Sequence, residues 1–186
     1  MDAVQALMTR QSTGRFDGDS LPEEILDVVL STAISAPDHG KLQPWKFLIF
    51  RGDARKQLGD IFAVSLEKRI SDAPKAQIDH ERAKPLRAPL LIAVVAKVDP
   101  LNTKIPVIEQ VLSAGAAAQN ILLAFHAQGF GCIWKTGAAA YDETVKAALG
   151  LDTQDQIVGF LYAGRLNAPL VKKERPNHTD FVEYWN

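Results

Sequence analysis

The sequence predicts a protein that mixes helices and strands, of the α/β or α+β class, and three observations support this. Segments with the apolar spacing of a helix alternate along the chain with short apolar runs that suit strands. The run 90–98 is apolar without interruption, which is typical of a strand buried on both faces. With 186 residues, the chain has the length of one ordinary domain, so we expect residues 1–186 to form a single domain.

Two predicted helices precede the first strand. Residues 2–10 have apolar side chains at helical spacing. The second helix has a start signal at Ser20, which we expect to be the N-cap because Glu23 follows three residues later. This helix ends before Pro37, since proline cannot continue a helix. The first strand is predicted at 45–51.

The middle of the chain predicts two further helical segments and the buried strand. Asp53 is the expected cap of a helix that runs to about residue 70. Residues 71–86 are charged and alternate poorly, so we expect a mobile helix or a lid-like excursion. After the strand at 90–98, residues 108–128 predict a long helix, with Gly129 as its C-terminal stop.

The last third predicts strands at 130–134 and 157–164 with a capped helix at 142–149 between them. The tail from residue 167 has no strong period but ends in aromatic residues, and such a tail often docks on a second copy of the chain. Residues 113–118 of the long helix are small and apolar, which would let another element approach closely. They are equally consistent with packing under the protein's own sheet.

Composition narrows the class of protein. A net charge of −1 gives no electrostatic reason to expect nucleic acid or a membrane surface as a partner. The single cysteine excludes an intrachain disulfide and a cysteine-cluster metal site. No stretch approaches the roughly 20 apolar residues of a membrane span, and the N-terminus lacks the pattern of a signal peptide. We therefore expect a soluble cytoplasmic protein.

The usual catalytic and phosphate motifs are missing from the sequence. It contains no Gly-x-Ser-x-Gly elbow and no P-loop, and its four histidines lack metal-ligand spacing. Cys132 lies in an apolar strand, where a cysteine is usually an inert small hydrophobe. A bound nucleotide would therefore need side chains for its phosphate, and Arg10-Gln11-Ser12 and 172–175 offer them. Two solvated basic patches are the simpler interpretation.

The segment 35–45 is the richest in chemistry. It joins a predicted helix to a predicted strand and carries a histidine, a lysine, a glutamine and a tryptophan between two prolines and a glycine. Loops held by a rigid scaffold are where binding groups concentrate. The alternative is a proline-stiffened turn whose tryptophan caps the core.

Several groups of residues, in this order and at these separations, resemble the nitroreductase-like flavoprotein family, and more narrowly its short, minimal branch. The resemblance covers essentially the whole chain. Each group alone is weak, but their joint order is specific. The groups are Arg10-Gln11-Ser12 with Arg15, the loop and strand from Ala36 to Phe47, Ser113-Ala114-Gly115-Ala116, Gln128 to Gly137, and Ile157 to Gly164.

This resemblance implies an α+β, nitroreductase-like fold with a mixed central β-sheet flanked by helices, assembled as an intertwined homodimer that binds two flavin mononucleotides (FMN) across its interface. Arg10, Gln11 and Ser12 would hold the phosphate and the ribityl chain. Gln11 stands where the family has a second arginine, which removes a positive charge. Lys172 or Lys173 in the tail could supply it.

The resemblance also implies which residues surround the flavin ring. His39 and Gln43 would line it, together with Ser35, which falls where related short chains tend to carry a basic residue. The partner subunit's strand and turn would add Gly131, Cys132, Ile133, Trp134, Lys135 and Thr136.

The implied function is oxidoreduction by FMN. In the family, NAD(P)H delivers a hydride to the flavin, which then passes electrons to a nitroaromatic, a quinone or a similar acceptor in ping-pong order. No protein side chain is then expected to act as a catalytic acid or base, and no metal is implied. The alternatives are a flavin carrier or chaperone without turnover, and a structural dimer without flavin.

Overall fold

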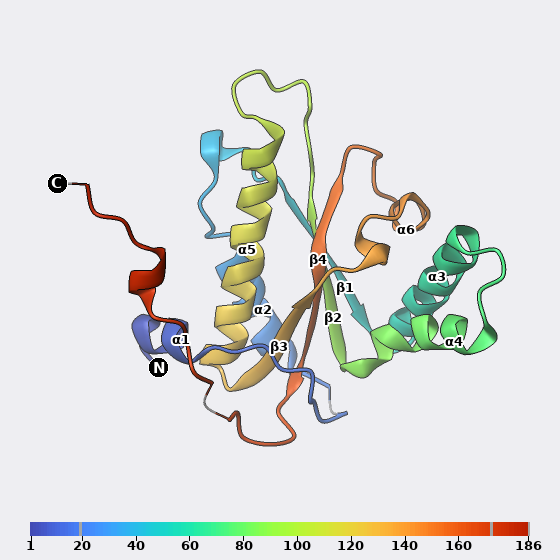
Figure 1. Cartoon of the computed structure of the whole chain (residues 1–186), viewed down its shortest axis with the longest axis horizontal. Coiled ribbons are helices and arrows are strands. Elements are labelled where there is room, and N and C mark those ends of the chain that lie inside the picture. The colour runs from blue at the N-terminus through green and yellow to red at the C-terminus, as the bar shows by residue number, and fades with distance from the viewer. Residues whose placement is uncertain (19, 172, 186) are drawn as a thin grey trace.

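A four-stranded sheet separates two layers of helices (Figure 1). The computed structural model describes residues 1–18, 20–171 and 173–185. Across the sheet, the strands lie in the order β1 (Trp45–Arg51), β2 (Leu90–Ala96), β4 (Gln156–Arg165) and β3 (Phe130–Lys135). Helices α2 and α5 cover one face, while α3, α4 and α6 lie on the other side.

The helices and short 3-10 turns are interleaved with these strands. The α-helices are α1 (Ala3–Thr9), α2 (Glu23–Ala33), α3 (Ala54–Arg69), α4 (Lys75–Ala83), α5 (Val107–Ala127) and α6 (Glu143–Ala148). The 3-10 turns are η1 (His39–Lys41), η2 (Lys84–Arg87), η3 (Ala138–Ala140) and η4 (His178–Phe181). The α+β class is thereby confirmed.

Most predicted elements are confirmed because their signals are local. The strand at 45–51 has the predicted ends. Gly129 ends α5 with φ of +81°, a conformation that suits glycine, and its N–H donates to the carbonyl of His126. Asp142 caps α6 by accepting hydrogen bonds from the backbone N–H groups of Thr144 and Val145.

Three expectations are wrong. Ser20 is not an N-cap: α2 begins at Glu23 with Pro22 in the N-cap position, because Leu21 is buried in the core and proline fixes the backbone before the helix. Asp53 is at the N-cap of α3 but makes no capping bond, since its carboxylate pairs with Lys56 at 2.8 Å. The sheet is not mixed, because all three pairings of the described strands are antiparallel.

Strand β2 is the centre of two hydrophobic clusters. Leu90, Ile92 and Val94 belong to the α5-side cluster, together with residues of α2 and α5. Leu91 and Val95 belong to the α3-side cluster, together with residues of α3 and α6. Every residue of β2 is buried, as the sequence predicted for a strand covered on both faces.

Helix α5 has a buried face and an open one. Ala114 and Ala118 are completely buried under the sheet, whereas a Cβ added at Gly115 would meet no atom within 4 Å. Ile108 and Leu112 are 61% and 62% exposed. Packing of the small residues under the protein's own sheet is thereby confirmed for Ala114 and Ala118, while Gly115 leaves space on another face of the helix.

By length and composition alone, α5 is long and apolar enough to cross a membrane. This differs from the expectation that the chain has no such stretch. In the fold, 44% of its most apolar window is buried by the chain itself. The buried side chains of α5, among them Ala114, Ala118 and Phe125, pack in the α5-side cluster, and the remaining face is open.

Residues 71–86 form α4 and part of η2, so the helical alternative holds for this segment. Helix α4 packs closely on α3 at Gly59, where an added Cβ would overlap the carbonyl oxygen of Arg82. The missing side chain therefore sets the distance between the two helices.

We expect Gly59→Ala to lower the free energy of unfolding by about 1–3 kcal/mol, because α4 must move away from α3 to admit the methyl group. Urea denaturation measures this. Lys68→Ala, an exposed position on the same helix, should change it by less than about 0.5 kcal/mol. Equal stability of Gly59→Ala and the wild type would contradict the close approach.

Candidate functional site

Residues 10–18, called the strap below, connect α1 to the edge of the sheet. The N–H of Thr13 donates to the carbonyl of Cys132 at 3.3 Å, and the N–H of Asp17 donates to the carbonyl of Arg165 at 3.0 Å. A Cβ added at Gly131 would lie 2.7 Å from the Thr13 side chain and 2.6 Å from that of Leu166. Gly131 is therefore needed for the strap to lie directly on β3.

Four cavities follow the strap, and each shares lining residues with the next. The tail cavity, of about 690 Å³, lies between α1 and the tail. It shares Gln11 and Lys173 with the strap cavity of about 340 Å³. Arg15 also lines the sheet cavity, again about 340 Å³. The sheet cavity in turn shares Arg87 with the α4 cavity of about 290 Å³.

The tail end of this series is positively charged. The Nη1 atom of Arg10 is buried without a hydrogen-bond partner, and Arg175 donates a hydrogen bond to the backbone carbonyl of Arg10. Burial lowers the pKa of Arg10, and the nearby charge of Arg175 lowers it further. Neither guanidinium forms an ion pair with any carboxylate of the described residues. Two like charges side by side, one with an unsatisfied donor, suit an anion.

Other polar side chains lie beside the two arginines, around the strap and tail cavities. The amide of Gln11 donates to the carbonyl of Val171 at 2.8 Å, which ties the strap to the tail. Ser12 is exposed in the strap cavity, and Lys173 lines both the strap and the tail cavities. Lys172, the other tail lysine of the prediction, lies outside the described residues.

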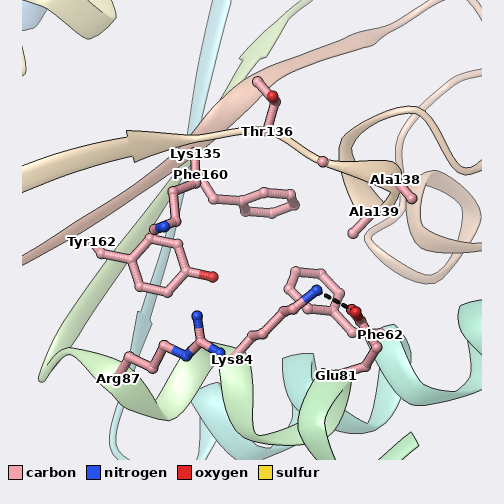
Figure 2. A pocket seen from close by; sticks show the side chains of 11 residues that line it. Phe62, Glu81, Lys84, Arg87, Lys135, Thr136, Ala138, Ala139, Phe160 and Tyr162 are labelled. Atoms are coloured by element: carbon pink, nitrogen blue, oxygen red, sulfur yellow. Dashed lines mark hydrogen bonds and ion pairs between the residues drawn. The ribbon is translucent and has the colours of Figure 1, made fainter. Parts of the chain in front are cut away.

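The α4 cavity, at the other end of this series, is lined by aromatic and charged side chains (Figure 2). The rings of Phe62 and Phe160 meet edge to face, with centroids 5.2 Å apart. Tyr162 turns its hydroxyl toward the same space, and burial raises its pKa to about 12, so the group stays a neutral donor near neutral pH. Lys84 pairs with Glu81 across the cavity wall.

Strand β3 sends its side chains alternately to the two faces. Cys132 and Trp134 pack in the α5-side cluster, and the indole N–H of Trp134 donates to the carbonyl of Val158 at 3.1 Å. Burial raises the pKa of the Cys132 thiol well above its usual range, so the thiolate is not available near neutral pH. Ile133 and Lys135 line the sheet cavity, and Thr136 lines the α4 cavity.

The loop 35–43 is held by its own hydrogen bonds. Ser35 donates from its hydroxyl to the carbonyl of Thr32 at 2.7 Å. Gln43 adopts a φ of +50°, and its N–H donates to the Asp38 carboxylate at 2.7 Å. An uncommon backbone conformation fixed by a side chain indicates a rigid loop.

His39 in this loop contacts the start of α5. Its Nδ1 lies 2.5 Å from the Glu109 carboxylate, and since an ionised carboxylate can only accept, Nδ1 carries the proton. The pair lines a separate cavity of about 380 Å³ with Leu112.

One chain does not bring all predicted residues together. His39 lies at the N-terminal end of α5, beside Glu109. Arg10 lies at the other end, where the hydroxyl of the preceding Thr9 is 2.8 Å from His126 Nε2. Seventeen residues of α-helix span about 25 Å, so the loop and the strap lie at opposite ends of the molecule.

Sequence reasoning missed four residues that line the α4 cavity, namely Glu81, Lys84, Arg87 and Tyr162. The first three lie in the segment 71–86 or just after it, which the sequence analysis considered only as a helix or an excursion. A pattern of charges spaced three apart, at 81, 84 and 87, is the signal that could have marked one helical face.

The chain resembles several known proteins along its length. A nitroreductase family model matches residues 7–165. The "Putative NAD(P)H nitroreductase YdjA" of Escherichia coli (strain K12) is 40% identical over 189 residues, covering 100% of both chains. A nitroreductase-like family protein from Bacillus cereus superposes with a TM-score of 0.84 at 27% identity, covering 100% of this chain and 96% of that one. A "putative nitroreductase in complex with FMN" from Desulfovibrio desulfuricans shares the fold, with a TM-score of 0.75 at 24% identity and coverage of 99% and 98%.

Proposed function

Since this chain belongs to the nitroreductase family, we propose that it is an FMN-dependent NAD(P)H oxidoreductase that works as a homodimer. It would take electrons from NAD(P)H and pass them, in ping-pong order, to a nitroaromatic, a quinone or a similar acceptor. The relatives support this, because one carries an NAD(P)H nitroreductase name and another of the same fold was solved with FMN.

The observation that carries the proposal is the unsatisfied guanidinium of Arg10. Its Nη1 is buried without a partner beside a second arginine, Arg175. A buried unpaired donor costs about 1–3 kcal/mol, more when it is charged, and a phosphate would recover that cost. Ser12 and Lys173, on the adjoining cavity, add a hydroxyl and an ammonium group. This end of the site therefore fits the phosphate of FMN.

The sheet cavity fits the ring. Its lining residues from the strap and from β3 belong to one chain, so we propose that β3 of the same chain borders the ring, in place of the partner's strand that the family resemblance implied. Phe16, Ile133 and Tyr162 give it an apolar wall, and Arg87 and Lys135 place donors at its rim. A planar aromatic cofactor needs such a wall and a few donors at its heteroatom edge. When bound, FMN would supply the hydride and electron chemistry, while these side chains bind and orient it.

The separation of the loop 35–43 from the strap along α5 supports the proposed homodimer. If two copies pair their α5 helices antiparallel about a two-fold axis, the partner's loop 35–43 comes beside this chain's strap. The partner's Ser35, His39 and Gln43 would then complete the pocket. The open face of α5 supports this arrangement, since Ile108 and Leu112 are exposed there with Gly115 following one turn later.

Lys135 and Thr136 take a smaller part in this proposal than the family resemblance implies. Both side chains line the α4 cavity of their own chain. Only Lys135 also reaches the sheet cavity. We therefore propose Lys135 at the rim of the ring pocket and leave the side chain of Thr136 outside it.

Purified protein should be yellow, release FMN on denaturation, and consume NAD(P)H in the presence of a nitroaromatic or a quinone. Absorbance of the nicotinamide and a mass spectrum of the released cofactor measure both properties. Protein that takes up no added FMN would refute the proposal. Protein that binds FMN tightly but never turns over would instead be the flavin carrier.

We expect Arg10→Met to weaken FMN binding by about 1.5–3 kcal/mol, the contribution of a charge-assisted hydrogen bond. Fluorescence titration of apoprotein with FMN measures the affinity. Lys68→Met removes a distant exposed charge and should bind FMN like the wild type. An unchanged affinity of Arg10→Met would show that Arg10 does not hold the phosphate.

Gly115→Leu should shift the protein from dimer to monomer and reduce FMN retention together with it. The single chain has space for the larger side chain, so the helical content should be preserved. Sedimentation velocity and circular dichroism separate the two effects, with Gly115→Ala as the smaller change at the same site. A folded, full-strength dimer of Gly115→Leu would place the interface elsewhere.

A further inference from the structure

The α4 cavity lies directly beyond the proposed ring pocket. The two cavities share Arg87, Lys135 and Tyr162, so a molecule in the α4 cavity would be next to a ring in the sheet cavity. The α4 cavity is lined by α3, α4, η2, β4 and the turn after β3, all belonging to one chain. It therefore exists without the proposed partner.

The charges around this cavity do not cancel. Lys84 is neutralised by its ion pair with Glu81. Arg87 has its Nη2 at 3.1 Å from His80 Nε2, and neither Arg87 nor Lys135 is within 4.0 Å of a carboxylate of the described chain. Two positive charges thus remain.

The rest of the lining is apolar and the space is small. Phe62 and Phe160 contribute ring faces and edges, and Ala139 contributes a methyl group. Pockets for drug-sized ligands span about 300–1,000 Å³, so about 290 Å³ suits a single-ring molecule better than a second nucleotide. The Tyr162 hydroxyl adds one neutral donor directed into the cavity.

We infer that the α4 cavity binds the electron acceptor, and that it selects a one-ring aromatic molecule bearing a carboxylate or another anionic group. This rests on the proposed function. For a nitro substrate, the balanced step is R–NO₂ + NAD(P)H + H⁺ → R–NO + NAD(P)⁺ + H₂O. The nicotinamide loses two electrons, the nitro nitrogen gains them, and one oxygen leaves as water. The ring carboxylate takes no part in the chemistry and serves only for binding.

Calorimetric titration of the FMN-loaded protein with benzoate and with benzamide tests the binding. Benzoate should bind about tenfold or more tightly than its neutral counterpart, the effect of a charge-assisted hydrogen bond. Lys84→Met, which leaves Glu81 unneutralised, should weaken benzoate binding about tenfold. Glu81→Gln should strengthen it. Both residues line the α4 cavity and not the sheet cavity, so the flavin spectrum should be unchanged.

Lys68→Met is the matched control, because it removes one exposed lysine charge on α3 that lines none of these cavities. Benzoate binding should be the same in this variant as in the wild type. Equal binding of benzoate and benzamide, or unchanged benzoate affinity in both Lys84→Met and Glu81→Gln, would overturn the inference.

Turnover separates this inference from the proposed function. The kcat/KM for 4-nitrobenzoate should exceed that for 4-nitrobenzamide by about tenfold in the wild type, and Lys84→Met should remove most of this preference. Equal kcat/KM values for the two compounds would refute the inference but leave the oxidoreductase intact. Failure to reduce either of them or any quinone would refute both.

Discussion

Complete burial of β2 is the constraint on which the rest of the structure depends. Its side chains fill both hydrophobic clusters, so neither face of the central sheet is free for a ligand near this strand. The sheet cavity lies toward β3, one of the two edge strands, where the strap and η2 leave part of the sheet uncovered. The binding groups accordingly come from segments that cross this edge. Binding sites are commonly formed by loops that a rigid sheet holds in position.

The candidate site is built at some cost to the stability of the chain alone. Arg10 and Arg175 lie close together, and one buried donor of Arg10 has no partner. The lowered pKa of Arg10 expresses the same cost, since burial and a like charge both disfavour its protonated form. An anion that binds only the folded state would be stabilising in proportion to its affinity. Binding and stability are therefore expected to be linked at this end of the site.

The sequence predicted the elements well where the signals are local, as for the cap at Asp142 and the stop at Gly129. It failed where packing overrides a local signal, as at Ser20, whose capping pattern yields to the burial of Leu21. It also missed Lys84 and Arg87, because their position beside Tyr162 depends on the close contact of α3 and α4. The pairing of His39 with Glu109 joins residues 70 apart in the chain and has no local signal at all.

The length of α5 is the physical basis of the proposal that two copies share the site. A straight helix with completely buried alanines cannot bend enough to bring its two ends together. The loop 35–43 and the strap are fixed to opposite ends of it, so within one chain their groups serve different places. A two-fold axis near the middle of α5 would bring the N-terminal end of this helix in one copy beside the C-terminal end of the same helix in its partner. A small residue at the middle of the open face, as Gly115 is, is what such an axis would require, because there each helix would meet its own symmetry mate.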